Sequence, residues 1–336
     1  MHLNRVTARH RAPSHLDLAG RGRRMIRWSR LALAAIVALL STAAMAGTAL
    51  AQGTSYSFRT LDNTGDVTFN QLLGINNLGQ IAGYFGSGAQ GAPNKGYLLT
   101  RSGLQRIYGS ENFPGSVQTQ VTGINDRGVT VGFWSDQNTA SQMNDNFGFY
   151  SVGGDHFHSV NFPTTDNSTP PVNQLLGVND SDVAVGFYTD SNGDDHGYTY
   201  DIRTKQYQLI SIPGATSVTA AAINNHDETA GFETDSSGAV NGYLLNDHGI
   251  TILDVPGAGM TEALGVNDND EVVGVYQSGT VMHGFTWTPT GGYTTVDDPN
   301  GVGTTTLNGV NDRGQLVGFY VDAAGNTDGL LASPQL

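Results

Sequence analysis

A short motif occurs six times along the chain, and this repeat constrains the fold more than any other feature of the sequence. Each copy holds an Asn-Asn or Asn-Asp pair directly after an Ile or Val, and successive copies lie 43 to 54 residues apart. A period of this length indicates that each repeat is one supersecondary unit, which buries its apolar face against its neighbours. The first Asn of the six pairs is Asn76, Asn125, Asn179, Asn224, Asn267 and Asn311.

Each period holds four short β-strand candidates, named A to D here, separated by turn residues, and no segment has the periodicity of a helix. Residues in two columns suit a pleated, half-buried surface, so we expect both columns to form the core. Strand A contributes the β-branched column Ile75, Ile124, Val178, Ile223, Val266 and Val310. Strand B contributes the mostly aromatic column Tyr84, Phe133, Phe187, Phe232, Val275 and Phe319.

The Asn pair between strands A and B has the composition of a tight turn. Its first Asn can accept a hydrogen bond from the backbone two residues on, and the fourth turn position is expected at positive φ. That position is Gly79, Gly128 and Gly314 in three repeats and Asp182, Asp227 and Asp270 in the others. We interpret the six Asn residues as turn residues, with a ring of ligand-binding amides as the alternative.

Four strands in each period predict an all-β fold, a six-bladed β-propeller of four-stranded blades. The sixth repeat ends after its third strand, whereas Tyr56 to Leu61 resembles a strand D. We therefore expect this N-terminal strand to pair near Leu330 and Leu331, which completes the last blade and removes two open edges. Residues 52–336 then form a single six-repeat domain.

Residues 1–51 have the pattern of a cleaved signal peptide. Basic residues precede an apolar run from Leu31 to Leu40, and Ala49-Leu50-Ala51 matches a signal-peptidase site. The alternative is a membrane anchor, but the run is shorter than the roughly 20 residues that a spanning helix needs. We expect a secreted or periplasmic protein with no membrane span after cleavage.

Charge and cysteine content exclude several classes of function. Residues 52–336 carry eight basic and 29 acidic side chains, a formal net charge of −21. Nucleic acid and anionic membranes are therefore disfavoured as partners, because both are bound through Lys and Arg. With no cysteine, the chain has neither disulfides nor thiolate metal ligands. We expect a monomer whose stability rests on its core.

The repeat unit resembles that of bacterial extracellular proteins of the HAF-repeat type. The residues that carry the resemblance are the Gly-[Ile/Val]-Asn-[Asn/Asp] unit, a downstream Gly-aromatic pair and a Pro-Gly turn, and they cover residues 56–336. His196-Gly197-Tyr198 and His283-Gly284-Phe285 have Gly where the name-giving triplet has Ala. The resemblance implies an exported, propeller-like protein, and it implies no activity or catalytic residues.

Strand direction alternates, so the B-C loops and D-A links share one face of the predicted propeller. These connections vary between repeats, which is typical of binding sites on a fixed scaffold. Aromatic and short polar side chains there suit a glycan, a peptide or another cell-surface component. Hydrated hairpin tips would have the same composition. The candidate ligand-binding residues are Trp134, Asp136, Asp145, Asp190, Asn192, His196, Asp235 and His283.

Metal binding is the most specific chemical hypothesis that the sequence offers. Asp190, Asn192 and Asp194 place oxygen atoms at alternate positions, as in a calcium loop, but Asp195 stands where such a loop needs Gly. A hairpin tip explains the same residues, so the cofactor stays unknown, with calcium as one candidate. His156 and His158 lie on one side of a strand, without a third zinc ligand nearby in sequence.

Two classes of function remain. The first is an exported binding or interaction module with an unknown ligand. The second is a carbohydrate-active or other hydrolytic enzyme, for which Glu233 and Glu262 are the best carboxylate pair. The largest breaks in the repeat, at 135–147 and 163–172, contain neither His nor Glu, which favours binding.

Overall fold

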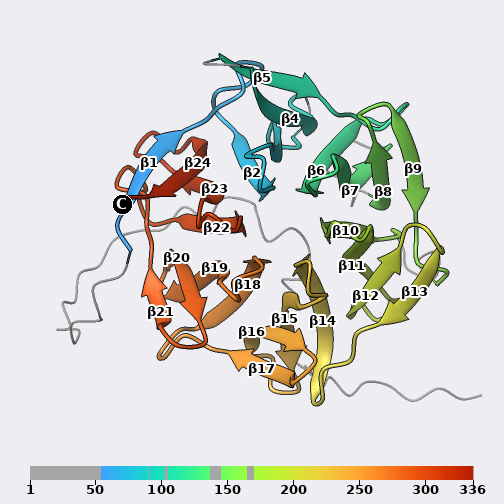
Figure 1. Ribbon diagram of the computed structural model, residues 1–336, viewed down its shortest axis with the longest axis vertical. Coiled ribbons are helices and arrows are strands. Elements are labelled where there is room, and N and C mark those ends of the chain that lie inside the picture. Colours follow the sequence, from blue (N-terminus) through green and yellow to red (C-terminus); the bar gives the residue numbers. More distant parts are fainter. Residues whose placement is uncertain (1–53, 90, 103–104, 137–144, 165–169, 336) are drawn as a thin grey trace, which may run out of the picture. The chain divides into compact units, whose positions relative to one another are not determined.

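The chain folds into six four-stranded antiparallel sheets, arranged around an axis as the blades of a β-propeller (Figure 1). The computed structural model describes residues 54–89, 91–102, 105–136, 145–164 and 170–335, and they contain no helix. The predicted all-β, six-bladed fold is therefore confirmed. The predicted signal peptide lies outside the described residues.

The blades follow one another along the chain, and in each of the first five blades the four strands occur in sequence order from the axis outward. The strands of blades 1 to 3 are β2 (Asn70–Ile75), β3 (Ile81–Phe85), β4 (Lys95–Ser102) and β5 (Gln105–Ser110); β6 (Gln118–Ile124), β7 (Val129–Ser135), β8 (Phe147–Val152) and β9 (His156–Val160); and β10 (Asn173–Val178), β11 (Val183–Thr189), β12 (Asp195–Asp201) and β13 (Gln206–Leu209). Those of blades 4 to 6 are β14 (Ala215–Ile223), β15 (Thr229–Asp235), β16 (Val240–Asn246) and β17 (Gly249–Leu253); β18 (Met260–Val266), β19 (Val272–Ser278), β20 (Val281–Thr288) and β21 (Gly292–Thr295); and β22 (Thr305–Val310), β23 (Leu316–Val321), β24 (Thr327–Pro334) and β1 (Tyr56–Thr60).

The last blade is completed by the N-terminal strand, as predicted. Strand β1 pairs antiparallel with β24, with Thr60 opposite Leu330 and Arg59 opposite Leu331. The backbone N–H of Leu61 continues this pairing by donating to the carbonyl of Gly329 at 2.8 Å. Residues from the two ends of the described chain therefore lie in the same sheet.

The deepest part of the core lies between neighbouring blades. One residue of each strand A is fully buried there: Leu72, Val121, Leu175, Ala220, Ala263 and Leu307. The residue after the strand C glycine is buried almost completely in each blade: Tyr97, Phe149, Tyr198, Tyr243, Phe285 and Leu330. Each of these side chains lies opposite a strand B glycine, as in the pair Phe149 and Gly132. Strand A bulges at this level, and a Cβ on Gly186 would lie 1.9 Å from the carbonyl oxygen of Gln174.

The predicted strand B column is only partly in the core. Tyr84, Phe133, Val275 and Phe319 are buried, whereas Phe187 and Phe232 are half-buried. The predicted strand A column is buried at 6 to 8% exposure, and its residues also line a pocket on the axis. The prediction that this column is core was therefore wrong for Phe187 and Phe232, and in all six blades the deeper positions belong to the strand C side chains.

Two faces of the propeller result from the alternating strands. The turn face carries the A-B turns at 76–79, 125–128, 179–182, 224–227, 267–270 and 311–314. The loop face carries the B-C loops and the D-A links. Among the described residues, no helix is long and apolar enough to cross a membrane.

Candidate functional site

Each A-B turn on the turn face is capped by its own first Asn. Oδ1 of Asn76 accepts hydrogen bonds from the backbone N–H of Leu78 at 3.1 Å and of Gln80 at 2.9 Å. The same two bonds occur in the other five turns. The fourth turn residue has positive φ throughout, with Asp182 at 63° and Asp270 at 59°. Both predictions for this turn are confirmed.

The same six Asn side chains also form a closed ring of hydrogen bonds around the axis, which we call the asparagine ring. Nδ2 of Asn76 donates to the backbone carbonyl of Asn125 in the next blade at 2.9 Å, and Asn311 returns to Asn76 at 3.1 Å. The four intervening bonds have the same form. All six side chains are buried. Each one therefore caps its own turn and connects its blade to the next.

A second closed ring, the mixed ring, is formed by the residues that follow: Asn77, Asp126, Asp180, Asn225, Asp268 and Asp312. The backbone N–H of each donates to the side-chain Oδ1 of its counterpart in the next blade, at 2.7 to 2.9 Å. Four of the six members are aspartates. The mixed ring therefore places four carboxylates near the axis.

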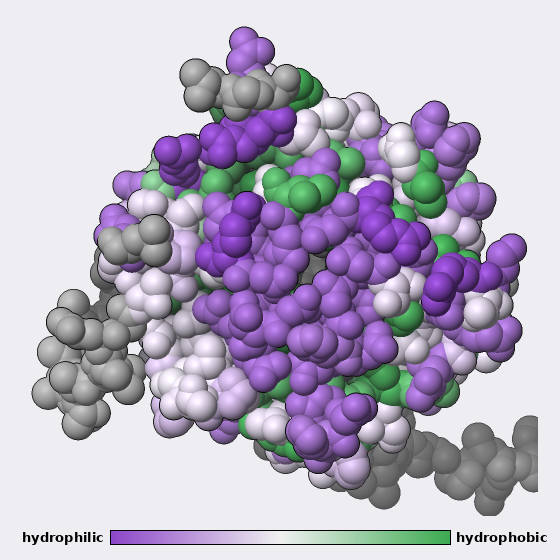
Figure 2. Space-filling model, in the orientation of Figure 1, coloured by the Kyte–Doolittle hydropathy of each residue, from purple (hydrophilic) through white to green (hydrophobic). Residues whose placement is uncertain are grey.

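A polar pocket of about 70 Å³ lies on the axis inside these rings. Its walls are the six asparagines, the members of the mixed ring and the β-branched column of strand A. Figure 2 shows hydrophilic residues around a central hollow. This volume accommodates a few water molecules. Sequence analysis interpreted the six asparagines as turn residues, and the two rings show that these residues and their neighbours also form contacts between blades.

On the loop face, blades 3 and 5 each stack a tyrosine on a histidine that is paired with an aspartate; the aspartate comes from the B-C loop in blade 3 and from the D-A link in blade 5. Tyr188 stacks on His196, with ring centroids 5.0 Å apart, and Tyr276 stacks on His283 at 5.2 Å. Nε2 of His196 lies 3.1 Å from Oδ2 of Asp190, and Nδ1 of His283 lies 2.7 Å from Oδ2 of Asp297. The side chain of His196 is 39% exposed and that of His283 is 26% exposed.

In blade 2, the structure packs Trp134 into the contact with blade 1. The indole stacks on Phe113 at 4.6 Å and contacts Phe147 at 4.9 Å. Its Nε1 is buried and meets no acceptor among the described residues. Asp145 accepts a hydrogen bond from Ser135 at 2.8 Å, while Asp136 is exposed. Burial raises the pKa of Asp145, and the negative charge of Asp136 adds to the increase.

The residues of the predicted calcium loop form the tip of the β11-β12 hairpin. Oδ1 of Asp190 accepts hydrogen bonds from the backbone N–H of Asn192 at 2.8 Å and of Asp194 at 3.1 Å. Burial acts to raise the pKa of Asp190, but hydrogen bonds from His196 and the two backbone N–H groups outweigh it, so the pKa is lowered. The carboxylate therefore organises its own hairpin.

Asp235 organises the next hairpin in the same way. Its Oδ1 accepts hydrogen bonds from Ser237 and Ala239, and the Ser237 hydroxyl is the main cause of its lowered pKa. The predicted binding residues are thus brought into contact only within single blades: Asp136 lies near Asp145, and Asp190 contacts Asn192, Asp194 and His196. Asp235 and His283 belong to blades 4 and 5.

The other candidate residues are found in separate environments. His158 stacks on Tyr150 at 4.7 Å, and Nε2 of His156 lies 3.5 Å from Asp155. Glu233 accepts a hydrogen bond from Asn241 at 2.8 Å. Burial raises the pKa of Glu262, in strand A of blade 5, to about 7.

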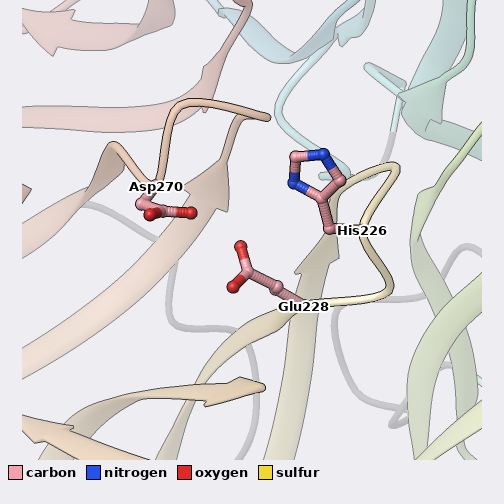
Figure 3. Close-up of side chains that lie close together, drawn as sticks. All are labelled: His226, Glu228 and Asp270. Carbon is pink, nitrogen blue, oxygen red and sulfur yellow. The ribbon is translucent and has the colours of Figure 1, made fainter. Parts of the chain in front are cut away.

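Sequence analysis missed one group of possible metal ligands. Ligand atoms of His226, Glu228 and Asp270 all lie within 4.8 Å of one another, where the A-B turns of blades 4 and 5 meet (Figure 3). Figure 3 shows the three side chains directed toward a common space. His226 is exposed, and the two carboxylates are partly buried.

No family model and no curated protein matches the sequence. Among solved structures, a protein of unknown function from Dyadobacter fermentans is similar with a TM-score of 0.56 and 10% identity, over 85% of this chain and all of the other. A mutant of Aleuria aurantia lectin in complex with Fucα1-6GlcNAc has a TM-score of 0.49 and 10% identity, over 79% of this chain and 91% of the lectin. A streptogramin B lyase has a TM-score of 0.48 and 8% identity, over 83% and 98% of the two chains. The likeness concerns the fold.

Proposed function

We propose that the chain is an exported binding module that holds a glycan on the loop face of the propeller. The basic segment, the apolar run and the Ala49-Leu50-Ala51 site support export to the periplasm or beyond. The resemblance of the repeats to exported proteins of the HAF-repeat type supports it as well. The observation that carries the binding proposal is the pair of Tyr-His stacks, Tyr188 with His196 and Tyr276 with His283.

The chemistry of these two stacks suits a polyhydroxylated ligand. The partly exposed imidazoles of His196 and His283, together with the half-buried ring of Tyr276, supply apolar contact area for the C–H face of a sugar. Tyr188 is buried between His196 and Phe162 and supports the imidazole from below. Asp190 and Asp297 each accept a hydrogen bond from one ring nitrogen of the neighbouring histidine, which fixes the imidazole in place. Among the described residues, none hydrogen-bonds to the other ring nitrogen of either histidine. That nitrogen can therefore bind a sugar hydroxyl.

Variation between blades also supports the proposal that the binding site lies on the loop face. The cross-strand pair at the end of strand B and the start of strand C changes from blade to blade, whereas every A-B turn begins with an Asn-Asn or Asn-Asp pair. The six cross-strand pairs are Phe85-Lys95, Trp134-Phe147, Tyr188-His196, Glu233-Asn241, Tyr276-His283 and Tyr320-Asp328. A site that differs between otherwise equal blades can select one ligand over another.

The test is a glycan array probed with the purified protein and with the double variant His196→Asn, His283→Asn. Asn already occupies the equivalent position in blade 4, as Asn241, so the blades are expected to fold unchanged. Because the variant loses both imidazole stacks, its affinity for the best glycan should fall by at least about tenfold, or about 1.4 kcal/mol.

The matched control is Asp126→Asn on the turn face, since Asn77 and Asn225 are the natural occupants of two positions in the mixed ring. This control should keep full affinity. Loss of binding in Asp126→Asn with full binding in the double variant would place the ligand on the turn face. An array without any bound glycan would overturn the proposal.

A further inference from the structure

The contact between the A-B turns of blades 4 and 5 differs from the other contacts of its kind. At three of these contacts, the third turn residue of one blade lies next to the fourth turn residue of the following blade. Between blades 2 and 3, the guanidinium of Arg127 forms an ion pair with Asp182. Between blades 6 and 1, Arg313 lies over Gly79, which has no side chain. Between blades 4 and 5, the two residues are His226 and Asp270.

Asp270 lacks the partners that its counterparts have. Asp182 is held by Arg127 and Asn125 of the preceding blade, and Asp227 accepts a hydrogen bond from Asn179 at 2.8 Å. The equivalent amide for Asp270 belongs to Asn224, but it donates to Glu228 at 2.7 Å instead. Among the described residues, none donates a hydrogen bond to Asp270. The carboxylates of Glu228 and Asp270 therefore lie close together, with no permanent positive charge between them.

We propose that His226, Glu228 and Asp270 bind a divalent transition-metal ion, Zn²⁺ in the first instance, which connects blades 4 and 5. One imidazole nitrogen and two carboxylates are a donor set typical of zinc, whereas calcium prefers oxygen ligands alone. The ion supplies the positive charge that Arg127 supplies between blades 2 and 3. This proposal is independent of glycan binding, because the site lies on the turn face.

The geometry needs only small side-chain movements. Ligand atoms around a tetrahedral zinc lie about 3.4 Å apart, given metal-ligand distances of about 2.0 to 2.2 Å. The three ligand atoms here lie within 4.8 Å of one another, and the exposed His226 can rotate toward the two acids. Asn224 and Asn246 donate to the two oxygens of Glu228, at 2.7 and 3.2 Å, and so orient it toward the site. Three protein ligands leave a fourth position for water.

No other blade combines the three residue types. In blade 5, Glu271 is equivalent to Glu228, but the third turn residue is Asn269, and the fourth turn residue of blade 6 is Gly314. Within the described part of the chain, no other three His, Cys, Asp or Glu side chains bring their ligand atoms this close together. The repeat therefore provides a matched control position one blade away.

The experiment titrates ZnCl₂ into the tag-free protein by isothermal calorimetry, with the melting temperature as a second readout. We expect one ion per chain, and a higher melting temperature with zinc because the ion binds the folded state. His226→Asn, Glu228→Gln and Asp270→Gly should each weaken binding at this stoichiometry by at least about tenfold. All three replacements occur at the same turn positions of other blades, as Asn269, Gln80 and Gly79, so each variant is expected to fold.

The control variant Glu271→Gln should bind zinc as the original chain does, and CaCl₂ should bind much more weakly than ZnCl₂. Absence of one-to-one zinc binding would overturn the proposal. So would one-to-one binding that all three variants retain, because the ion would then occupy another site, such as the exposed His156 and His158.

Discussion

One asparagine in each A-B turn has two functions, and its two side-chain atoms separate them. Oδ1 of Asn125 accepts hydrogen bonds from the backbone N–H of Arg127 and Val129, which holds the turn. Nδ2 donates to the carbonyl of Asn179 in the next blade at 2.9 Å. The turn therefore needs only the oxygen, whereas the contact between blades needs the amide hydrogens.

Asn125→Asp separates these two roles. The carboxylate can still cap the turn, but it cannot donate to Asn179, and it adds a charge in a buried position. We expect a loss of about 1 to 3 kcal/mol in the free energy of unfolding, measured by urea denaturation. If the side chain served the turn alone, Asp would be tolerated there, and the variant would unfold at the same urea concentration as the original chain.

Glu262 gives a prediction of pH dependence. Its counterparts in blades 1 to 3 are the uncharged Gln71, Gln120 and Gln174. Burial raises its pKa from 4.5 to about 7 in the folded protein. As the pH falls through 7, the folded state takes up a proton that the unfolded state takes up only near 4.5. Protonation therefore stabilises the fold, and this stability is lost as the pH rises through 7.

Glu262→Gln should consequently raise the free energy of unfolding at pH 8, by about 1 to 3 kcal/mol. At pH 4 the difference between the two proteins should nearly vanish. Denaturation curves at both pH values measure this directly. An equal effect at pH 4 and pH 8 would show that packing, rather than ionisation, distinguishes the two side chains.

At the scale of single residues, the sequence predicted the turns but not the group of possible metal ligands. The Asn caps and the positive φ of Asp182 follow from local chemistry, so a short segment contains the necessary information. Asp270, in contrast, is 44 residues from His226 in the sequence. The two residues come together only because the A-B turns of blades 4 and 5 are neighbours in the fold. The nearest sequence signal is the Arg127 and Asp182 pair, which occupies the same two turn positions at the contact between blades 2 and 3.

At the scale of strands, the sequence identified which positions share a face but not which face lies deeper. Alternation placed Phe187 on one face of strand B, and we expected that face to be the core. Both faces of an inner strand contact a neighbouring blade, however, so hydrophobic alternation cannot rank them. Gly186, on the other face, leaves room for Tyr198, which is fully buried. On the loop face, the sequence likewise gave no sign that Trp134 would be covered by Phe113.

At the scale of the whole molecule, the incomplete sixth repeat predicted ring closure by the N-terminal strand. Removing residues 52–61 should lower the free energy of unfolding by several kcal/mol, because β24 loses its partner and the buried Leu61 is lost. A synthetic peptide of residues 52–61 should restore part of this loss. Thermal unfolding measures both effects. Equal melting temperatures for the shortened and full chains would mean that closure contributes nothing to stability.

The pairing of β1 with β24 also determines when folding can finish. Among the described strands, β1 is synthesised first and β24 last, so Tyr56 stays unpaired until Pro334, its partner in the register, has been made. Blades 1 to 5 each consist of consecutive strands, so they can form in turn as synthesis proceeds. The sixth blade cannot form in this way, because its outer strand, β1, is synthesised before all of its other strands. A chain that is released early is therefore left as an open arc, with an unpaired strand at one end.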